Sequence, residues 1–454
     1  MKIFSCALYK DRAGARNHGR NMQIADLRVH SVAIADPPLR SSYGLHAPYA
    51  LRTILELESE DRIVGISETH GGDSIAQGFR QLGEQIVGVG AYRLAGKLLP
   101  MIDASAPGDR SQTYHVPGEN PLDAAARLYS AIEIACLDLI GKSVGKPVCD
   151  LLGGRARSEV PFSAYPFYKH AGGGGEGEDL RPDEYGEALT PTQLVAQVRQ
   201  MFAKYGFREI KFKAGVLEPA EEIETVRQLR AEFGPKVPIR LDPNCAWSVA
   251  TSVEIGKALR EELGNGGYLE DPTANISGMA EVRKKLLAAG IQTPLASNVA
   301  VTSFADLPES VRTDAVQVVL CDPHYWGGIQ QVQQLGKLCH TFGLGLSMHS
   351  NSHLGVSLMA MAHAAAATPH LTYACDTHYP WQSAEDEVAA GGRVPIVNGC
   401  VHISEKPGLG VELDQDQLAR GRERYRKCKY RKRDDEAEMR KHVNPNWRRV
   451  LPRW

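Results

Sequence analysis

The sequence predicts an α/β protein built around a (β/α)8-type barrel, preceded by a smaller α+β unit. The first observation is an alternation of eight short apolar runs with helical segments over residues 156–400. Such alternation implies parallel strands joined by helices, and eight strand–helix units close into a barrel. The second observation is a change of texture before residue 155, where strand-like and helical stretches are mixed.

The N-terminal unit, residues 22–155, contains two stretches that alternate like antiparallel strands, DLRVHSVAI and ALRTILELES. A long, Ala-rich apolar stretch, PLDAAARLYSAIEIACLDLIGKSVG, predicts a single helix after them. Residues 1–21 contain Lys and Arg with a single Asp. We expect these residues to form a disordered leader, with a transit peptide as the alternative.

The eight predicted barrel strands are short and mostly apolar. Their sequences are VPFSAY, EIKFKAG, PIRLDPN, YLEDP, PLASN, AVQVVLCD, LGLSMHS and TYACDTH. Amphipathic stretches such as EPAEEIETVRQLRAEFG predict the helices between them. The link after the first strand, KHAGGGGEGEDLRPDEYGEALTP, is Gly-rich and acidic, so it indicates a flexible loop or lid rather than a phosphate-binding loop.

Composition argues against several classes of protein. The 454 residues carry a formal net charge of −2, which gives no field that would attract nucleic acid or a membrane surface. No apolar run approaches the roughly 20 residues needed to span a bilayer. Nine cysteines occur singly, which argues against a disulfide framework or a thiolate zinc site and favours a reducing cytoplasm.

A strongly basic stretch near the C-terminus, ARGRERYRKCKYRKR, has nine Lys or Arg in fifteen positions. Taken alone, it is the best argument for a nucleic-acid-binding tail. The near-neutral remainder of the chain and the lack of an RNA-binding motif in the sequence weaken that argument. We therefore interpret the stretch as a solvated helix.

Polar side chains stand at the carboxyl ends of the predicted strands, which a barrel brings to one mouth. Lys213 ends the second strand, and Lys211 shares its face because strand side chains repeat every two residues. Asp242, Glu270 and Asn298 end the next three strands at intervals of 29, 28 and 28 residues. The strand ends that follow carry Asp322, His349, Asp376 and His378.

Each of these residues has an ordinary structural explanation, but their order along consecutive strands favours a catalytic site. Asp, Glu and Asn supply hard oxygen ligands, which suit Mg²⁺ better than zinc. A second cation beside Lys213, together with the metal, would favour a neutral Lys213 that can accept a proton. The set therefore predicts proton abstraction next to a carboxylate, with Mg²⁺ stabilising the enediolate.

The run SMHSNSH offers a different interpretation, zinc binding through His349 and His353. No cysteine or carboxylate of the sequence completes such a site in the pattern that zinc requires. We expect His353 to face the helix that follows it.

These residues resemble the enolase superfamily, and specifically its glucarate dehydratase group. The resemblance extends over nearly the whole chain from Met22 and rests on the motifs KFK, RLDPNCAWS, LEDP, SN, DPHYWGG, MHSNSHLG, DTHYPWQ, EKPGLGVELD and RDD. It implies a (β/α)8-type barrel, residues 156–400, under an α+β capping domain. The N-terminal region and the C-terminal segment, residues 401–454, would build that domain together, so much of the basic stretch would belong to it.

The resemblance also implies roles for the residues at the strand ends. Asp242, Glu270 and Asn298 would bind Mg²⁺. Lys213, assisted by Lys211, would remove the proton next to the carboxylate of a substrate with one stereochemistry.

A histidine would serve the opposite stereochemistry. His349, oriented by Asp322, would remove the proton from that face and then protonate the departing hydroxyl. The residues that would contact the substrate are His46, Tyr165, Asn244, Asn351, His378 and Arg433.

Two residues depart from the family pattern. Ser41, five positions before His46, stands where the family carries Asn, and Ala125 stands near a position that carries Thr. Both lie on the capping side, so they bear on which acid sugar is bound and leave the proton-transfer residues intact. We expect a C6 aldarate, D-glucarate or L-idarate first and galactarate next.

The predicted activity is therefore Mg²⁺-dependent dehydration of an acid sugar to a keto-deoxy diacid. A racemase or epimerase with the same bases and a catalytically silent paralogue are the alternatives. We expect a small-molecule substrate, no nucleic acid or membrane partner, and a homo-oligomer.

Overall fold

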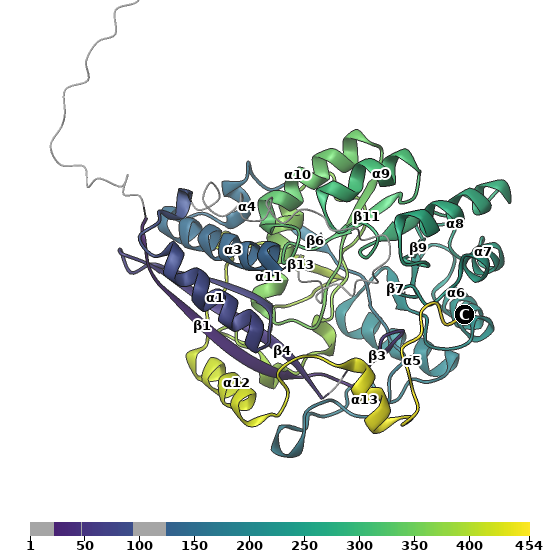
Figure 1. Cartoon of the computed structure of the whole chain (residues 1–454), viewed down its shortest axis with the longest axis horizontal. Helices are drawn as coiled ribbons and strands as arrows, with labels where there is room; N and C mark the ends of the chain where they lie inside the picture. Colours follow the sequence, from purple (N-terminus) through teal and green to yellow (C-terminus); the bar gives the residue numbers. More distant parts are fainter. Residues whose placement is uncertain (1–21, 47, 94–123) are drawn as a thin grey trace, which may run out of the picture.

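The computed structural model describes residues 22–46, 48–93 and 124–454 (Figure 1). The predicted leader, residues 1–21, lies outside the described residues. A barrel with its surrounding helices lies beside a smaller unit of strands and helices, and the C-terminal segment first runs along that smaller unit and then ends beside the barrel helices (Figure 1). The predicted domain boundaries, 22–155, 156–400 and 401–454, stay predictions.

An antiparallel sheet forms the N-terminal unit. Its strands are β1 (Ile24–Ala35), β4 (Tyr49–Ser59) and β5 (Val64–His70), in the spatial order β1-β4-β5. A short hairpin, β2 (Arg40–Ser41) with β3 (Gly44–Leu45), lies between β1 and β4 in the chain. Helices α1 (Asp73–Ile86) and α3 (Ala124–Val144) pack on the sheet. The two predicted strands and the described part of the predicted helix are confirmed.

Strand β4 is buried on both faces, which explains its apolar sequence. Leu55 and Leu57 point toward α1 and α3 and pack with Phe79. Ile54, one residue along, joins the large core of the barrel instead, because successive side chains of a strand point to opposite faces. Each such buried side chain stabilises the fold by roughly 1.5–3 kcal/mol. The sheet therefore joins its own helices to the barrel.

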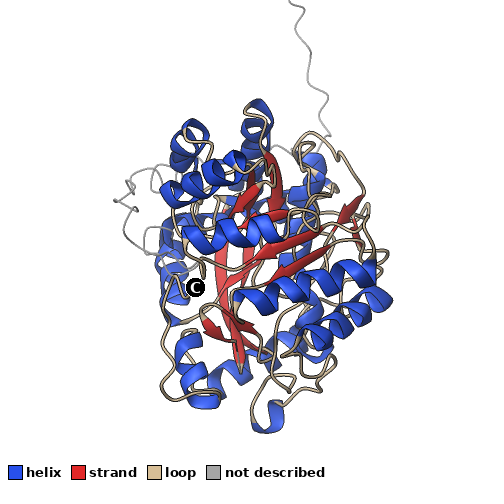
Figure 2. Cartoon of the chain, turned by 90° about the vertical axis from the view of Figure 1, so that its right-hand side faces the viewer, coloured by secondary structure: helices blue, strands red, loops and turns tan. Residues whose placement is uncertain are grey.

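Six parallel strands form the barrel sheet, in the spatial order β12-β11-β10-β9-β8-β7. They are β7 (Ile210–Lys213), β8 (Ile239–Asp242), β9 (Tyr268–Glu270), β10 (Leu295–Ser297), β11 (Val318–Cys321) and β12 (Gly345–Met348). The alternating helices are α5 (Pro191–Tyr205), α6 (Pro219–Phe233), α7 (Val249–Ala258), α8 (Ile276–Ala288), α9 (Leu307–Arg312), α10 (Gly328–Thr341) and α11 (Gly355–Ala366). The helices lie outside the strands in Figure 2.

Shorter elements complete the chain. They are α4 (Val148–Leu151), β6 (Glu159–Pro161), β13 (Cys400–His402), α12 (Gln415–Lys427), α13 (Asp435–His442) and the 3-10 turns Ala91–Arg93, Gly177–Asp179, Phe304–Asp306, Tyr379–Trp381 and Ala384–Asp386. Strand β6 pairs with β13 in an antiparallel ladder outside the barrel sheet.

The first and eighth predicted barrel strands are extended segments rather than regular strands, which corrects the prediction. Isolated parallel bridges join Phe162 to Cys375 and Ala164 to Ile210. A third parallel bridge joins Phe167 to Lys213, so this segment follows β7, but Pro166 between the two bridges has no N–H group to donate to a regular ladder. Six of the eight predicted strands thus form the sheet, and the other two segments close it through isolated bridges.

Helix α5 shows why these helices begin and end where they do. Thr190 caps its first turn in a reciprocal capping box with Gln193, and Pro191 occupies the first helical position. Gly206 ends the helix with φ 66°, a left-handed conformation that glycine adopts without steric cost. Local sequence signals therefore set the helix that leads into β7.

The basic C-terminal stretch is largely part of the capping structure, as the resemblance implied. Helix α12 packs along β1, and α13 packs against β3 (Figure 1). Arg424 of α12 is buried, donates to the backbone oxygen of Ala33 and forms ion pairs with Asp179 and Asp386. The solvated-helix interpretation thus holds only for the outer face of α12.

The Gly-rich link after the first predicted strand is a loop, but defined contacts hold it in place. The Asp183 carboxylate accepts from Lys169 Nζ and from the backbone N–H of Gly172. Arg181 donates to Asp386 Oδ1 at 2.7 Å. The Asp183 contacts therefore close the expected flexible loop or lid on itself, and the Arg181–Asp386 contact ties it to a later segment of the chain.

Two class predictions can be compared with the described residues. The eight cysteines among them are free. None of the described helices combines the length and the apolar character needed to cross a membrane.

Candidate active site

Strand register places three of the predicted residues in one row at the carboxyl ends of the strands. Lys213 of β7 pairs with Asp242 of β8, and the register between β8 and β9 continues the row to Glu270. Asn298 follows β10, the next strand in the sheet. All four side chains are buried. The structure therefore brings together residues that the sequence separates by 28 or 29 positions.

Lys211 is a buried cation among three carboxylates. Its Nζ lies 2.6 Å from Asp376 Oδ2, 2.8 Å from Glu270 Oε1 and 3.6 Å from Asp242 Oδ2. Burial would lower the pKa of Lys211, but Asp376 and Glu270 raise it well above its usual value. Lys211 is therefore held as an ammonium ion, which supports the predicted second cation beside Lys213.

Lys213, at the end of β7, lies in a triangle with Tyr165 and Asp242. Its Nζ donates to Asp242 Oδ2 at 2.8 Å and to Tyr165 Oη at 3.2 Å, while the Tyr165 hydroxyl donates to the same Asp242 oxygen at 3.0 Å. Burial would raise the pKa of Asp242, but the two lysines lower it to about 2. Burial and Asp242 raise the pKa of Tyr165 well above its usual value, so Tyr165 is a neutral donor.

Two oxygens at the strand ends fit a metal ion. Glu270 Oε2 and Asn298 Oδ1 are buried and have no hydrogen-bond partner. A buried acceptor left unsatisfied costs about 1–3 kcal/mol. Carboxylate and amide oxygens are the ligands that Mg²⁺ takes. Together with the Asp242 carboxylate, these residues fit a magnesium ion.

The charge of Glu270 is consistent with that fit. Burial raises the pKa of Glu270 well above its usual value, and the neighbouring Asp242 adds to the effect. A divalent cation would favour the ionised form. Among the described residues, no group of three or more His, Cys, Asp or Glu side chains is arranged to hold a metal. That result is expected where an amide supplies one of three ligands.

Asp271 holds the backbone at Asn298. Its Oδ2 accepts from the backbone N–H of Asn298 at 2.9 Å, and its Oδ1 accepts from the Ser297 hydroxyl at 2.5 Å. Asp271 itself has φ 38°, a strained conformation for a residue other than glycine. The Asn298 main chain is therefore fixed by its neighbours, which leaves its amide oxygen free to face a ligand.

A histidine and an aspartate face each other at the other edge of the sheet. His349 follows β12 and Asp322 follows β11, and His349 Nδ1 lies 3.2 Å from Asp322 Oδ2. Burial would raise the pKa of Asp322, but His324 and His349 lower it well below its usual value. The Tyr325 and His349 rings pack in a T-shaped arrangement, with the ring centroids 5.9 Å apart. The predicted pair is in contact.

Three carboxylates from other elements hold the loops that carry these residues. Glu222 of α6 accepts three backbone N–H groups of residues 215–217, in the loop that follows β7. Glu133 of α3 accepts two N–H groups at the start of α10. Glu68 of β5 accepts two at the start of α11. Helix N-termini favour such anions, so the capping unit helps to fix the barrel loops.

Three of the predicted substrate contacts gather in one aromatic cluster. The His378 ring centroid lies 5.0 Å from that of Tyr165, 5.2 Å from that of Phe167 and 6.2 Å from that of His46. Burial and His46 lower the pKa of His378 well below its usual value. The charges of Lys213 and His349 also act on His378, so the cluster lies within reach of both.

The two predicted asparagines are held by different parts of the fold. Asn244 has φ 44°, and its N–H donates to Asp242 Oδ1 at 3.1 Å, a turn in which asparagine tolerates positive φ. Asn351 Nδ2 lies 3.0 Å from His70 Nε2 at the end of β5. Asn244 is thus adjacent to the metal-binding row, and Asn351 to the capping sheet.

Arg433 lies on the capping side. It forms a double hydrogen bond with Asp435, at 2.6 and 2.5 Å. Burial would raise the pKa of Asp36, but His46, assisted by the charge of Arg433, lowers it. His46 lies between these carboxylates, 3.5 Å from Asp36 and 4.0 Å from Asp435. The structure therefore joins His46 and Arg433, which the sequence separates widely.

The two residues that depart from the family pattern, Ser41 and Ala125, lie in different elements of the capping unit. Ser41 is buried, and its Oγ accepts from the backbone N–H of Tyr43 at 3.2 Å. Ala125 belongs to α3, but its side chain lies outside the described residues.

His353 contacts Thr377 Oγ1 and the backbone oxygen of Leu354, both at 3.0 Å.

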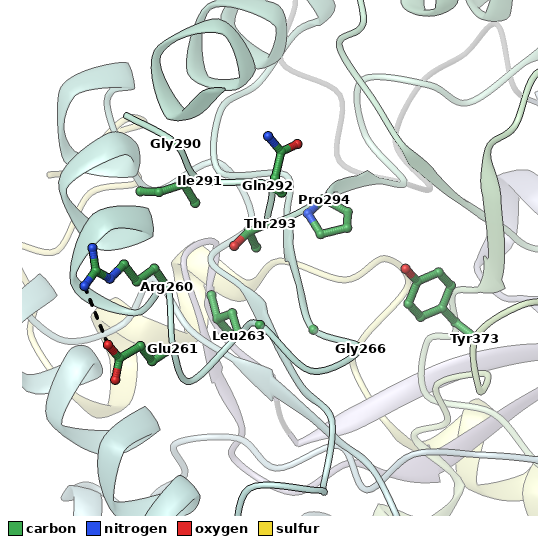
Figure 3. A pocket seen from close by; sticks show the side chains of 12 residues that line it. Arg260, Glu261, Leu263, Gly266, Gly290, Ile291, Gln292, Thr293, Pro294 and Tyr373 are labelled. Atoms are coloured by element: carbon green, nitrogen blue, oxygen red, sulfur yellow. Dashed lines mark ion pairs between the residues drawn. The ribbon is translucent and has the colours of Figure 1, made fainter. Parts of the chain in front are cut away.

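A cavity of about 490 Å³ lies at the opposite end of the strands (Figure 3). Its lining includes Arg260, Glu261, Leu263, Gln292, Thr293 and Tyr373. Most of these residues precede β9 or β10, so the cavity is at the amino ends of the strands. Barrel enzymes carry their chemistry at the carboxyl ends, so this cavity is separate from the candidate active site.

Known proteins resemble both the sequence and the fold. The chain is 43% identical over 445 residues to a probable glucarate dehydratase from Streptomyces coelicolor, with 96% of this chain and 100% of that protein covered. Residues 193–417 match the family described as enolase C-terminal domain-like. The chain belongs to the enolase superfamily.

Solved structures of other enolase superfamily members agree with this assignment. An enolase from Pseudomonas fluorescens, with bound magnesium, potassium and tartrate, has a TM-score of 0.88 and 44% identity, covering 95% of this chain and 99% of that one. An enolase from Mycobacterium smegmatis, complexed with tartrate, has a TM-score of 0.85 and 45% identity over 95% and 98% of the two chains. The predicted fold class is thereby confirmed.

Sequence reasoning assigned no role to two residues of this superfamily member that the structure places in the site. Asp376 was a strand-end residue without a function, and it is the shortest contact of Lys211. His324 was not singled out, although it is only two positions from Asp322 and lies 2.6 Å from its Oδ1. The regular spacing of the strand ends pointed to Asp376, whereas nothing in the sequence distinguished His324.

Proposed function

We propose that the chain is a Mg²⁺-dependent dehydratase of a C6 aldarate, D-glucarate or L-idarate first and galactarate next. One observation carries the proposal. Lys213 and His349 end β7 and β12, the outer strands of the six-stranded sheet, and Asp242, Glu270 and Asn298 end the strands between them. Two proton-transfer groups then face one substrate from two sides of a metal site.

The metal ion would be held by the oxygens of Asp242, Glu270 and Asn298. When bound, Mg²⁺ supplies positive charge that stabilises the negative charge developing on the substrate carboxylate. Two carboxylates and a neutral amide balance a divalent cation before the substrate arrives. A dianionic substrate then meets no extra negative charge from the third ligand. The magnesium in the Pseudomonas fluorescens enolase supports this choice of ion.

Each base would remove the proton from one face of the carbon next to the carboxylate. Lys213 takes it from one epimer, with the buried ammonium of Lys211 on the same face of β7. His349 takes it from the other epimer, while Asp322 orients the imidazole.

Loss of water would follow from the same groups. The C–H bond breaks with its proton on Lys213 or His349, and the electron pair forms a C=C bond as the neighbouring C–O bond breaks. His349 protonates the departing hydroxyl, which leaves as water. The enol that remains becomes the keto-deoxy diacid. In the epimer whose proton Lys213 removes, His349 acts as an acid only.

The capping side would select the far end of the substrate. Arg433 supplies positive charge for a second carboxylate, and His46 lies beside it. Tyr165, Asn244 and His378 surround the metal-binding row, so they would contact the reacting end. Asn351, next to His70, would contact the substrate from the capping sheet.

A substrate screen tests the proposal. The protein is incubated with MgCl₂ and a set of C6 diacids in deuterium oxide, and proton NMR follows keto-acid formation and α-proton exchange. We expect a keto-deoxy diacid from at least one aldarate, abolished by EDTA and by His349→Ala. Absence of a keto-acid product from every diacid would reject the proposal.

A racemase or epimerase is the second candidate, because two opposed bases are also what a 1,1-proton transfer needs. Exchange of the α-proton without loss of water would favour it. Unchanged behaviour of Lys213→Ala and His349→Ala would instead favour a silent paralogue.

We also propose that the enzyme acts as a homo-oligomer in the cytoplasm. The free state of the eight described cysteines supports a reducing compartment. Light scattering after size-exclusion chromatography measures the oligomeric state, and a monomer at micromolar concentration would contradict the first part.

A further inference from the structure

Asp322 contacts two histidines, one on each carboxylate oxygen. Oδ2 lies 3.2 Å from His349 Nδ1, whereas Oδ1 lies 2.6 Å from His324 Nδ1. The backbone N–H of His324 also donates to Oδ1, at 2.8 Å. Of these two histidines, the proposed chemistry uses only His349. The shorter of the two imidazole contacts is therefore made by the histidine that this chemistry leaves unexplained.

His324 is also held on its far side. Its Nε2 lies 2.8 Å from Ser357 Oγ in the first turn of α11, and the backbone N–H of Ser357 donates to Glu68 Oε2 at 2.9 Å. A hydroxyl can donate or accept, so Ser357 suits neutral and protonated His324 equally. His324 is only 3% exposed and Asp322 only 1%. Each ring nitrogen of His324 therefore has one defined protein partner.

We propose that His324 is a positioning residue for His349, acting through the Asp322 carboxylate that both imidazoles share. It fixes the carboxylate plane and takes part of its negative charge, and so sets how strongly Asp322 holds a proton on His349. The inference rests on the proposed function, in which His349 transfers protons to and from the substrate. It adds a residue that touches neither substrate nor metal ligands.

The surroundings leave Asp322 as the main partner of His324. Burial, followed by Arg127, lowers the pKa of His70 well below its usual value, and burial lowers the pKa of His353 to about 4. Both are therefore neutral near pH 7. The charged or titratable groups that act on this chain of contacts are Asp322, His349, His70, His353, His378, Tyr325, Arg52, Arg127 and Glu68.

The direction of the effect does not depend on the charge of His324. A neutral His324 donates one hydrogen bond to Asp322, and a protonated one adds a positive charge; either reduces the negative charge that reaches His349. Removing the imidazole therefore increases the proton affinity of His349 in both cases. The pH at which His349 becomes a free base therefore moves upward. The Asp322 carboxylate that orients the His349 ring also loses one of the groups that hold it in place.

The two epimers separate the two bases in one protein, which makes a sharp assay. The variants His349→Ala and Lys213→Ala first establish which epimer depends on which base, from α-proton exchange with deuterium oxide. In His324→Phe we expect exchange of the His349-dependent epimer to fall about 10- to 100-fold. In the pH profile of that exchange rate, the acid limb moves to higher pH. Exchange of the Lys213-dependent epimer changes less than about twofold, whereas dehydration of both epimers slows.

Conservative variants distinguish positioning from a general loss of structure. His324→Asn keeps an N–H near the position of Nδ1, so it restores most of the lost exchange. Ser357→Ala, a small change that leaves His324 in place, gives the same epimer selectivity with a loss of a few-fold. His363→Asn is the matched control, since His363 is equally buried but contacts the backbone N–H of Cys149. It lowers stability without changing the ratio of the two exchange rates.

The outcomes separate this inference from the proposed function. A wild-type protein that neither exchanges nor dehydrates any aldarate would reject the proposed function. Suppose instead that the wild-type protein is active, but His324→Phe and Ser357→Ala slow α-proton exchange of both epimers equally, or of neither. That result would overturn the role of His324 and leave the proposed function standing. If His324→Phe does not fold, the selectivity of Ser357→Ala decides by itself.

Discussion

Replacing Lys211 by Met tests whether this lysine is the counter-ion of the site. The side chain is fully buried, and its Nζ lies within 2.6 to 3.6 Å of Asp376, Glu270 and Asp242. Methionine keeps a long unbranched chain and removes only the charge. Removing one partner of a buried pair costs about 3–5 kcal/mol. We expect about 3 kcal/mol at pH 7, because Lys213 still donates a hydrogen bond to Asp242 and Glu270 can take up a proton.

The deficit of Lys211→Met depends on pH in a defined direction. Burial and Asp242 raise the pKa of Glu270 above its usual 4.5 in the folded protein, and Lys211 opposes that rise. The pKa of Glu270 is therefore raised further in the variant than in the wild-type protein. A raised pKa contributes stability that is complete below about 4.5 and is lost as the pH increases through the folded value. The difference in unfolding free energy between wild type and variant should thus be larger at about pH 8 than at about pH 5.

Urea unfolding in the presence of EDTA measures both effects. The matched control is Lys285→Met, which breaks an ion pair with Glu281 at 2.8 Å in which both side chains are about half exposed. Exposed ion pairs contribute little because solvent screens them, so the control should leave the free energy of unfolding nearly unchanged. A Lys211→Met variant as stable as the control at both pH values would refute the counter-ion role.

Three further predictions address the metal ligands, a supporting loop and acid stability. The Asn298→Asp variant should still bind Mg²⁺, as measured by calorimetric titration, but its turnover should fall about 100-fold. The reason is that a third carboxylate makes the site a weaker host for a dianionic substrate. Equal or better turnover would contradict the role of the neutral amide. Glu222→Gln should lose about 1–3 kcal/mol in urea unfolding and reduce turnover, because one of its two acceptor oxygens for residues 215–217 is removed; unchanged turnover would show that this loop does not position Lys213. His30, assisted by Arg28, lowers the pKa of Glu56 from 4.5 to about 2, so its stabilising contribution is present above about pH 4.5 and lost as the pH falls through 2. The urea midpoints of wild type and Glu56→Gln should therefore converge below pH 4.5, and a constant gap would count against this assignment.

The row of strand-end residues could be predicted because it follows from local rules. Each strand of the row is apolar and ends on a polar residue, and each is separated from the next by one helix, so Lys213, Asp242, Glu270 and Asn298 had to meet at one mouth. The same reasoning found Asp322 and His349. Parallel pairing needs only the order of the strands to bring such residues together.

The supports of the row could not be predicted, because they come from elements that are distant in the chain. Glu68 of β5 caps α11, and Glu133 of α3 caps α10, across the boundary between the capping sheet and the barrel. A buried Glu in a strand or a helix has many possible partners. The choice depends on how two separately formed units pack. The closing segments around Phe162 and Cys375 were misjudged for a related reason, since apolar runs at a barrel seam resemble strands without forming a ladder.

The sequence by itself determined the α/β class, the order of the barrel strands and the residue types at their carboxyl ends, since periodicity and spacing are properties of the chain. Tertiary structure decided which charges are paired. Lys211 makes its shortest ion pair with Asp376 of the closing segment, and His324, the second histidine on Asp322, is held on its far side by Ser357 in the first turn of α11. Pairing of buried charges depends on distances of a few ångströms between remote segments, and only the packed fold sets those distances.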